Sequence, residues 1–254
     1  MEENKSGFSP RALFSLAKKV IAVPIHPAGI PFILGFLAIT FVFFFIDESL
    51  GAFGLILTAW CTYFFRNPDR YTPADDNLII APADGIVSMI TQAELPAEIT
   101  KGDAADHLFS APTVTRVSIF LNVFDVHVNR FPVSGDVTQV IYQPGKFLSA
   151  DLDKASLENE RSSIVMKIKN HASSIAFVQI AGLVARRIIC NATVGQSAKA
   201  GQVYGLIRFG SRVDIYLPAG VSPLVSLGQR MIGGETVIAD LSATAQTARL
   251  AEKR

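Results

Sequence analysis

The chain has 254 residues and a formal net charge of +1, and half of its residues are hydrophobic. This length allows one large domain, or one domain with an appended segment. The near-zero charge and the lack of a basic stripe argue against a nucleic-acid-binding protein. The two cysteines, Cys61 and Cys190, form no metal or redox spacing, so we expect buried thiols and no metal site.

Two apolar runs, Ile30–Ile46 and Leu50–Phe65, follow the polar and basic residues 1–20. Each run is slightly shorter than the roughly 20 residues of a full transmembrane helix. An acidic tip separates the runs and basic residues lie at both outer ends, as the positive-inside rule predicts for a hairpin with both ends in the cytoplasm. The sequence therefore predicts that residues 1–70 form a membrane-associating helical hairpin, which either spans the bilayer or only enters its surface.

From residue 71 to residue 241, short alternating or apolar runs recur between turn signals, which is typical of a β-rich domain. We expect 152–163 to be a charged loop and 242–254 to be a short helix or a frayed tail. The predicted fold is a mostly β (α+β) catalytic domain of short strands, preceded by the hydrophobic helical hairpin. The candidate strands are Asn77–Ile90, Thr113–Leu121, Asp136–Tyr142, Ser163–Lys169, Ser174–Ile180, Arg187–Ala192, Val203–Phe209, Arg212–Leu217 and Glu235–Ala239.

The first candidate catalytic residue, Asp84, lies in Ala81-Pro-Ala-Asp-Gly-Ile86, between an apolar run and a glycine. A strand that bends at such a point can direct a carboxylate into a pocket. A plain Asp-Gly turn is the structural alternative.

The second candidate, His127, lies in Phe120-Leu-Asn-Val-Phe-Asp-Val-His-Val-Asn-Arg-Phe-Pro132. In an extended chain, alternation places Asp125, His127 and Asn129 on one face. A neighbouring carboxylate or amide can fix the tautomer of an imidazole and shift its pKa. Arg130 would lie on the other face, or beside them after a turn, and its guanidinium suits a phosphate or carboxylate. A core histidine and a surface arginine are the structural alternatives.

The third candidate is the dipeptide Gly210-Ser211, which lies between two runs of alternating apolar residues. The alternation predicts two short strands, or one bent strand, with a kink at the glycine. The Ser211 hydroxyl could attack the unshielded Gly210 carbonyl and convert the amide into an ester. β-Elimination would then split the chain and leave a pyruvoyl group, whose ketone can form a Schiff base with an amine and accept electrons.

Two other functions fit parts of the pattern. A membrane-anchored serine hydrolase could use Asp84, His127 and Ser211 as a triad, although Ser211 lies between β-like runs rather than in the Gly-x-Ser-x-Gly turn of an α/β-hydrolase. A carrier module is the second alternative, because the sequence around Lys154 superficially resembles a lipoyl attachment site. The charged residues after Lys154 do not fit the returning strand of such a hairpin.

Taken together, the motifs resemble those of the phosphatidylserine decarboxylase proenzymes of the short bacterial type. The resemblance covers about residues 20–240, and the motifs occur in the order found in that family. They are Phe64-Phe-Arg-Asn-Pro68 at the end of the hairpin, Ala81-Pro-Ala-Asp-Gly85, Phe124-Asp-Val-His-Val-Asn-Arg130, Asn159-Glu-Arg161, Gln179-Ile-Ala-Gly-Leu-Val-Ala-Arg-Arg187 and Phe209-Gly-Ser-Arg-Val-Asp214.

The resemblance implies an enzyme of phospholipid biosynthesis that converts phosphatidylserine to phosphatidylethanolamine and carbon dioxide. It implies self-cleavage between Gly210 and Ser211 into a β chain, 1–210, and an α chain, 211–254, which form a heterodimer. Ser211 would become the covalently bound pyruvoyl cofactor. The resemblance also implies a processing triad of Asp84, His127 and Ser211, and a location at the cytoplasmic face of the cell (inner) membrane.

One position departs from the pattern of some longer family members, which have a second histidine where this chain has Arg130. His127 is therefore expected to serve both self-cleavage and a later proton transfer, or another group takes one of these roles. The decarboxylation of another amine or lipid and a higher oligomer remain open. The candidate substrate-binding residues are Asn129, Arg130, Arg186 and Arg187, with Arg208 and Arg212 as further candidates.

Overall fold

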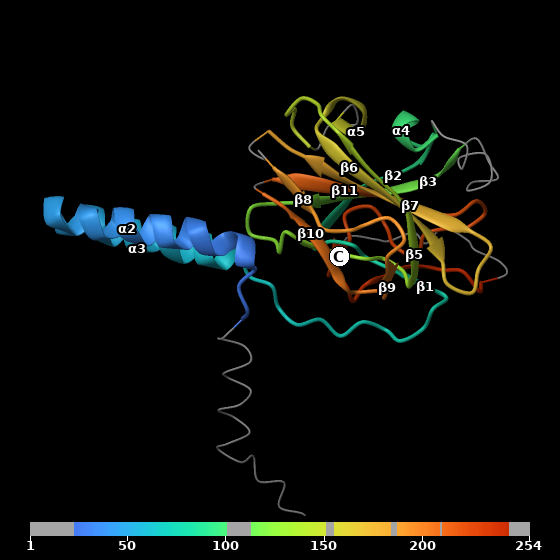
Figure 1. Ribbon diagram of the computed structural model, residues 1–254, viewed down its shortest axis with the longest axis horizontal. Helices are drawn as coiled ribbons and strands as arrows, with labels where there is room; N and C mark the ends of the chain where they lie inside the picture. The colour runs from blue at the N-terminus through green and yellow to red at the C-terminus, as the bar shows by residue number, and fades with distance from the viewer. Residues whose placement is uncertain (1–22, 101–112, 151–154, 184–186, 209, 244–254) are drawn as a thin grey trace, which may run out of the picture. The chain divides into compact units, whose positions relative to one another are not determined.

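The computed structural model describes residues 23–100, 113–150, 155–183, 187–208 and 210–243 (Figure 1). The chain forms two compact units, which meet in the sequence between Asp69 and Arg70.

The N-terminal unit contains two antiparallel helices, α2 (Ile30–Ile46) and α3 (Glu48–Phe64), preceded by the short 3-10 helix η1 (Pro27–Gly29). Asp47 makes the sharp reversal between them, because its carboxylate accepts a hydrogen bond from the Leu50 amide at 3.0 Å and caps α3. The helices pack through a hydrogen bond of 3.1 Å between the hydroxyl groups of Thr40 and Thr58. The predicted helical hairpin is therefore confirmed.

Helix α2 is apolar on all sides, and many of its large side chains are exposed, among them Phe41, Phe45 and Ile46. Within the described part of the chain, one helical segment, Pro27–Ile46, is long and apolar enough to cross a bilayer. An apolar helix without a polar face is typical of association with a membrane.

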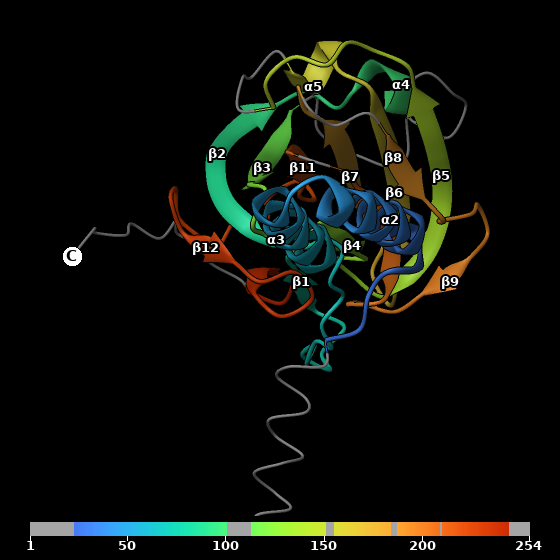
Figure 2. The ribbon, with the colours of Figure 1, turned by 90° about the vertical axis from the view of Figure 1, so that its left-hand side faces the viewer.

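The second unit is built on one curled sheet of eight strands, in the order β12-β2-β3-β11-β7-β6-β5-β9. Figure 2 shows β2 and β5 arcing around the strands between them. All described pairs in this sheet are antiparallel. The eight strands are β2 (Gly85–Ala93), β3 (Val114–Leu121), β5 (Gly135–Gln143), β6 (Arg161–Ile168), β7 (Ser174–Ala181), β9 (Ser197–Ala198), β11 (Ser211–Tyr216) and β12 (Arg230–Met231).

Two smaller sheets complete the unit. One pairs β1 (Leu78–Ile80) with β13 (Val237–Asp240), and the other has the order β4-β10-β8. The strands of the latter are β4 (Val128–Arg130), β10 (Val203–Ile207) and β8 (Ile188–Cys190). Short helices are α4 (Ala97–Thr100) and α5 (Ala155–Glu158). The predicted mostly β fold is confirmed.

Strand β11 separates two cores, because its side chains alternate between the two faces of the sheet. Val213 and Ile215 join the larger core with Ile119 and Phe177, whereas Tyr216 joins a smaller core on the opposite face. Arg212 and Asp214 also face that second side, and both are fully buried. Ser211 shares the parity of Val213, so its side chain belongs to the face of the larger core.

The structure corrects two sequence-based predictions. The segment 152–163 is not a continuous loop: residues 151–154 lie outside the described residues, but α5 follows them and β6 begins at Arg161. Ala155 is buried in the smaller core, which explains a helical turn inside a charged stretch. The single strand expected over Asn77–Ile90 is two strands, β1 and β2, which belong to different sheets. Of the predicted tail 242–254, residues 244–254 lie outside the described part.

Candidate active site

Ser211 is the first residue of β11, in the middle of the eight-stranded sheet. It is paired with Leu121 of β3 on one side and with Ala181 of β7 on the other. Its side chain is fully buried, and its Oγ makes no hydrogen bond with the described residues. A buried hydroxyl without a partner is costly for a fold and is typical of reactive sites.

Gly210 precedes the strand with a φ of +64°, a left-handed conformation that glycine adopts without strain. Its carbonyl lies against Gly182, so closely that a Cβ at Gly182 would overlap the Gly210 oxygen. The Gly210 carbonyl therefore has a fixed place directly beside the Ser211 hydroxyl, and that place exists because residue 182 has no side chain.

Asn159 holds the chain that carries Gly182. Its side chain is fully buried and donates hydrogen bonds to the carbonyl oxygens of Ala181, at 2.7 Å, and Leu148, at 2.8 Å. The Ala181 amide in turn donates to the carbonyl of Glu160 at 2.9 Å. Hydrogen bonds to both the carbonyl and the amide of Ala181 therefore hold the end of β7 that lies beside Ser211. The sequence motif containing Asn159 was noted without a role, because this contact joins segments that are distant in the sequence.

His127 lies just before β4 and is fully buried. Its Nδ1 lies 3.0 Å from the backbone carbonyl oxygen of Asp125. Since a carbonyl can only accept, this contact favours the neutral tautomer with the proton on Nδ1 and makes Nε2 the basic nitrogen. The His127 carbonyl also accepts a hydrogen bond from the Ile207 amide at 3.3 Å. The histidine is therefore tied to the strand that leads into Gly210-Ser211.

Asn129 and Gln179 form a buried amide pair on the same side of the sheet as Ser211. Gln179 Nε2 donates to Asn129 Oδ1 at 2.8 Å. Gln179 lies opposite Val213, one side-chain step along β7 from Ala181. Among the described residues, Asn129 Nδ2 and Gln179 Oε1 have no hydrogen-bond partner although both are buried. This pair therefore offers one donor and one acceptor near Ser211.

Asp84 directly precedes β2 and is bound by Arg70, whose Nη2 lies 2.9 and 2.8 Å from its two oxygens. The Gly233 amide also donates to Asp84, at 2.8 Å. Burial raises the pKa of Asp84 above its ordinary value, although Arg70 and Gly233 act in the opposite direction. The ion pair with Arg70 was not foreseen in the sequence. The role of Asp84 in orienting His127 stays a prediction.

The Arg130 side chain lies near this ion pair and not beside the Asn129 side chain. Its Nη1 donates to the Gly201 carbonyl at 3.0 Å, and Gly234 packs against both Arg130 and Arg70. This placement agrees with the alternation along β4, which puts Asn129 and Arg130 on opposite faces.

The other basic candidates are distributed unequally. Arg187 is exposed directly before β8, and its carbonyl accepts a hydrogen bond from the Arg208 amide at 3.3 Å. Burial and the charge of Arg187 lower the pKa of Arg208. Arg212 is fully buried on the opposite face of the sheet and pairs with Asp214 at 2.9 Å, which removes it from the Ser211 side. Arg186 lies outside the described residues.

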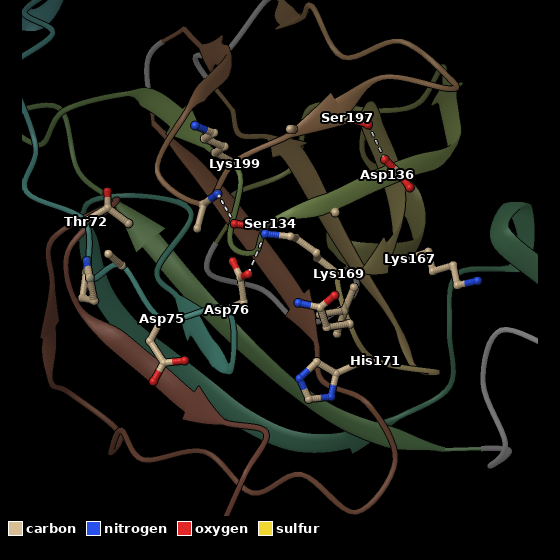
Figure 3. A pocket seen from close by; sticks show the side chains of 17 residues that line it. Thr72, Asp75, Asp76, Ser134, Asp136, Lys167, Lys169, His171, Ser197 and Lys199 are labelled. Atoms are coloured by element: carbon tan, nitrogen blue, oxygen red, sulfur yellow. Dashed lines mark hydrogen bonds and ion pairs between the residues drawn. The ribbon is translucent and has the colours of Figure 1, made fainter.

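A cavity of about 1050 Å³ lies at the other end of the sheet (Figure 3). Its lining includes Gly135 and Lys167. Lys167 is six residues along β6 from Arg161. Arg161 pairs across the strands with Ile180, which in turn pairs with Arg212, the residue after Ser211. At about 3.3 Å per residue, the cavity is roughly 20 Å from the row of Ser211. It is a separate feature from the candidate active site.

Comparisons with known proteins agree with the motifs. The model of the family described as phosphatidylserine decarboxylase matches residues 57–239. A phosphatidylserine decarboxylase proenzyme of Ruegeria pomeroyi is 52% identical over 218 residues, which cover 86% of this chain and 95% of the relative. The proenzyme of Cereibacter sphaeroides is 52% identical over 87% of this chain and 91% of its own length. That of Rickettsia felis is 52% identical over 85% of this chain and 90% of its own length.

Proposed function

The chain belongs to the phosphatidylserine decarboxylase family, and we propose that it decarboxylates phosphatidylserine with a pyruvoyl group made from its own Ser211. The product is phosphatidylethanolamine, with release of carbon dioxide. The observation that carries the proposal is the environment of the dipeptide: a buried Ser211 Oγ without a described partner, directly after a glycine whose carbonyl is held by Gly182.

The first reaction is self-cleavage. The Ser211 oxygen bonds to the Gly210 carbonyl carbon and the bond from that carbon to the Ser211 nitrogen breaks, which gives an ester and a free amine. A base then removes the Cα proton of Ser211 and the ester oxygen leaves Cβ, so that Gly210 ends in a carboxylate. Water replaces the nitrogen of the resulting dehydroalanine, ammonia departs, and the α chain begins with a ketone.

His127 is the base that we assign to this reaction. The Asp125 carbonyl holds its Nδ1 proton, so Nε2 is available to take the Ser211 hydroxyl proton. In a chain without the second histidine of some relatives, the same imidazole also returns a proton to the product. We propose that Asp84 supports this site through its negative charge, as the motif implies, while Arg70 fixes its position.

The fold around Ser211 fits a pyruvoyl group. The new N-terminus lies between β3 and β7, and the polar atoms Asn129 Nδ2 and Gln179 Oε1 are available on that side. When present, this group accepts the electrons released as the carboxyl group departs. Asn129 and Gln179 orient the serine part of the substrate, and Arg187 with Arg208 binds its phosphate. Arg130 and Arg186 remain candidates for the same phosphate.

The two chains produced by cleavage stay together as a heterodimer in this proposal. Strand β11 of the α chain is paired along its whole length with β3 and β7 of the β chain. The buried pair of Arg212 and Asp214 contacts Ser156, whose Oγ donates to Asp214 at 2.7 Å. The apolar hairpin attaches the enzyme to the cytoplasmic face of the inner membrane, where its substrate lies.

The proposal is tested with phosphatidylserine that carries a labelled carboxyl group. The full chain in detergent is expected to release labelled carbon dioxide, and Ser211→Ala is expected to release none. Brief treatment of the processed enzyme with borohydride, which reduces a ketone, is expected to abolish the activity. Full activity after borohydride, or in Ser211→Ala, would contradict pyruvoyl chemistry. Esterase activity without decarboxylation would instead favour the serine hydrolase.

A further inference from the structure

The loops after β3 and β7 each present a large apolar side chain to solvent. Phe124 is 61% exposed three residues after β3 ends at Leu121, and Leu183 is 69% exposed two residues after β7 ends at Ala181. Leu121 and Ala181 are the two residues paired with Ser211. The two apolar tips therefore follow the ends of the strands that flank the start of β11, at the same end of the sheet; Figure 1 shows β11 between β3 and β7.

Among the described residues beside these tips, the exposed charged side chains are basic. The Arg230 side chain is 63% exposed and binds Asp125, in the Phe124 loop, at 2.6 Å. Arg187 is exposed in the Leu183 loop, and Arg208 is its neighbour. The described acidic groups nearby are buried or paired: Asp125 is fully buried, and Asp84 is paired with Arg70. Apolar tips with arginines behind them suit the interface of an anionic bilayer, where apolar groups enter the acyl boundary and cations meet lipid headgroups.

The opposite end of the same sheet carries charges of both signs. The cavity shown in Figure 3 is lined by lysines and aspartates, and Lys169 pairs with Asp76 at 2.8 Å. One exposed apolar side chain in that region, Val194, is 64% exposed beside Gly195, whose amide binds the Val137 carbonyl. Val194 therefore supplies a control position of similar exposure far from Ser211.

We propose that the end of the sheet at which β11 begins docks directly on the surface of an anionic phospholipid bilayer. In this orientation Phe124 and Leu183 are inserted, and Arg187 and Arg230 contact the headgroups. This inference rests on the proposed function, because a lipid substrate must reach Ser211 with its tails still in the membrane. The residues of this docking surface all belong to the catalytic unit, whereas the apolar hairpin belongs to the N-terminal unit.

Because the hairpin alone can hold the chain on vesicles, the test has to report the position of each loop. Single tryptophans are placed at Phe124, Leu183 or Val194 in full-length Trp60→Phe protein, which removes the chain's own tryptophan. The proteins are reconstituted in vesicles of phosphatidylserine and phosphatidylcholine whose acyl chains carry bromine, a short-range quencher. Tips that enter the acyl boundary should be quenched at least about twofold more than the Val194 position. Equal quenching at all three positions would overturn the proposal.

A second measurement separates docking from catalysis. Phe124→Ser and Leu183→Ser are expected to decarboxylate a short-chain phosphatidylserine in detergent at the normal rate, but bilayer-embedded phosphatidylserine about tenfold more slowly. Val194→Ser should be normal on both substrates. Normal rates of both loop variants on bilayers would contradict docking. Loss of activity on the short-chain substrate in the parent protein would instead count against the proposed function, and the quenching result would still decide the docking.

Discussion

At the level of single residues, the proposed attack of Ser211 on the Gly210 carbonyl depends on groups that leave space for this carbonyl. Gly182 provides this space for the Gly210 oxygen, and Asn159 fixes the backbone beside it. In the proposed reaction, the backbone positions the nucleophile Ser211 and the Gly210 carbonyl, whereas the contact with the Asp125 carbonyl positions His127, the proposed base. Each contribution can be removed separately.

Gly182→Ala should slow self-cleavage by about 100-fold, because the new methyl group displaces the Gly210 carbonyl and such misplacement is costly for an intramolecular reaction. The rate is measured from the appearance of the two fragments on denaturing gels. Gly135→Ala is the matched control, since its Cβ would overlap the Lys167 carbonyl at the far end of the sheet. Cleavage of the Gly182 variant at the rate of the control would refute the positioning role.

His127→Asn should slow cleavage by about 10²- to 10⁴-fold, the usual contribution of a general base. The amide of asparagine can still donate to the Asp125 carbonyl, so the loop is kept while the basic nitrogen is lost. His127→Ala removes both functions and serves as the comparison. Cleavage at the normal rate in the asparagine variant would show that another group takes the proton.

The candidate site could be predicted from the sequence only in part. Alternation and motif order point to Ser211, His127 and Asn129, and the structure links Asn129 through Gln179 to the side of the sheet that carries Ser211. The partnership of Arg70 with Asp84 was missed, as were the roles of Gly182 and Gln179. These roles depend on contacts between segments that are distant in the sequence. Gly182 acts through the absence of a side chain, and such a role leaves no local sequence pattern.

At the scale of elements, the short helix α4 is attached to β6 by a buried ion pair. Arg161 binds Glu98 at 2.6 and 2.8 Å, and Ser163 also donates to Glu98 at 3.0 Å. Burial alone would raise the pKa of Glu98, but the hydrogen bonds and charge of Arg161 lower it below its ordinary value. The pair therefore stabilises the fold above the unfolded pKa of Glu98, and this contribution is lost as the pH falls through the lower, folded pKa.

Glu98→Gln should lower the melting temperature at neutral pH by roughly 6–10 °C, because breaking a buried pair leaves Arg161 without its counter-charge. The difference between the variant and the parent should shrink below about pH 4, where the parent's own carboxylate takes up a proton. Thermal melts of the full chain in detergent, at both pH values, provide the measurement. Lys146 with the exposed Glu158 is the control pair, for which Lys146→Met should have little effect. A difference that stays constant with pH would contradict the assignment.

The sequence predicted most strands but not their grouping. Alternating runs such as Ser174–Ile180 and Arg212–Leu217 gave β7 and β11 to within a residue or two, because both strands have one regular burial pattern. The very short β4, β9 and β12 were missed, since two or three residues hold no measurable period. The sheet order places β11 between β3 and β7, which lie far earlier in the chain, and no local signal encodes such pairing.

At the level of the whole molecule, the chain combines an apolar hairpin with a β unit whose main sheet differs in polarity between its two ends. The central position of β11 means that scission at its first residue leaves the strand fully paired on both sides. A cut at this point therefore creates a new chain end inside an intact sheet. With this arrangement, the proposed conversion of Ser211 into a reactive group leaves the pairing of β11 unchanged.

An intact mass spectrum of the purified full chain, beside its Ser211→Ala variant, shows whether the chain cleaves itself at Ser211. We predict two fragments for the parent, 1–210 and 211–254, with the smaller one carrying a pyruvoyl group in place of its N-terminal serine. The variant should give one uncut chain. A single mass for the folded parent, or a smaller fragment that begins with an unmodified serine, would contradict the account.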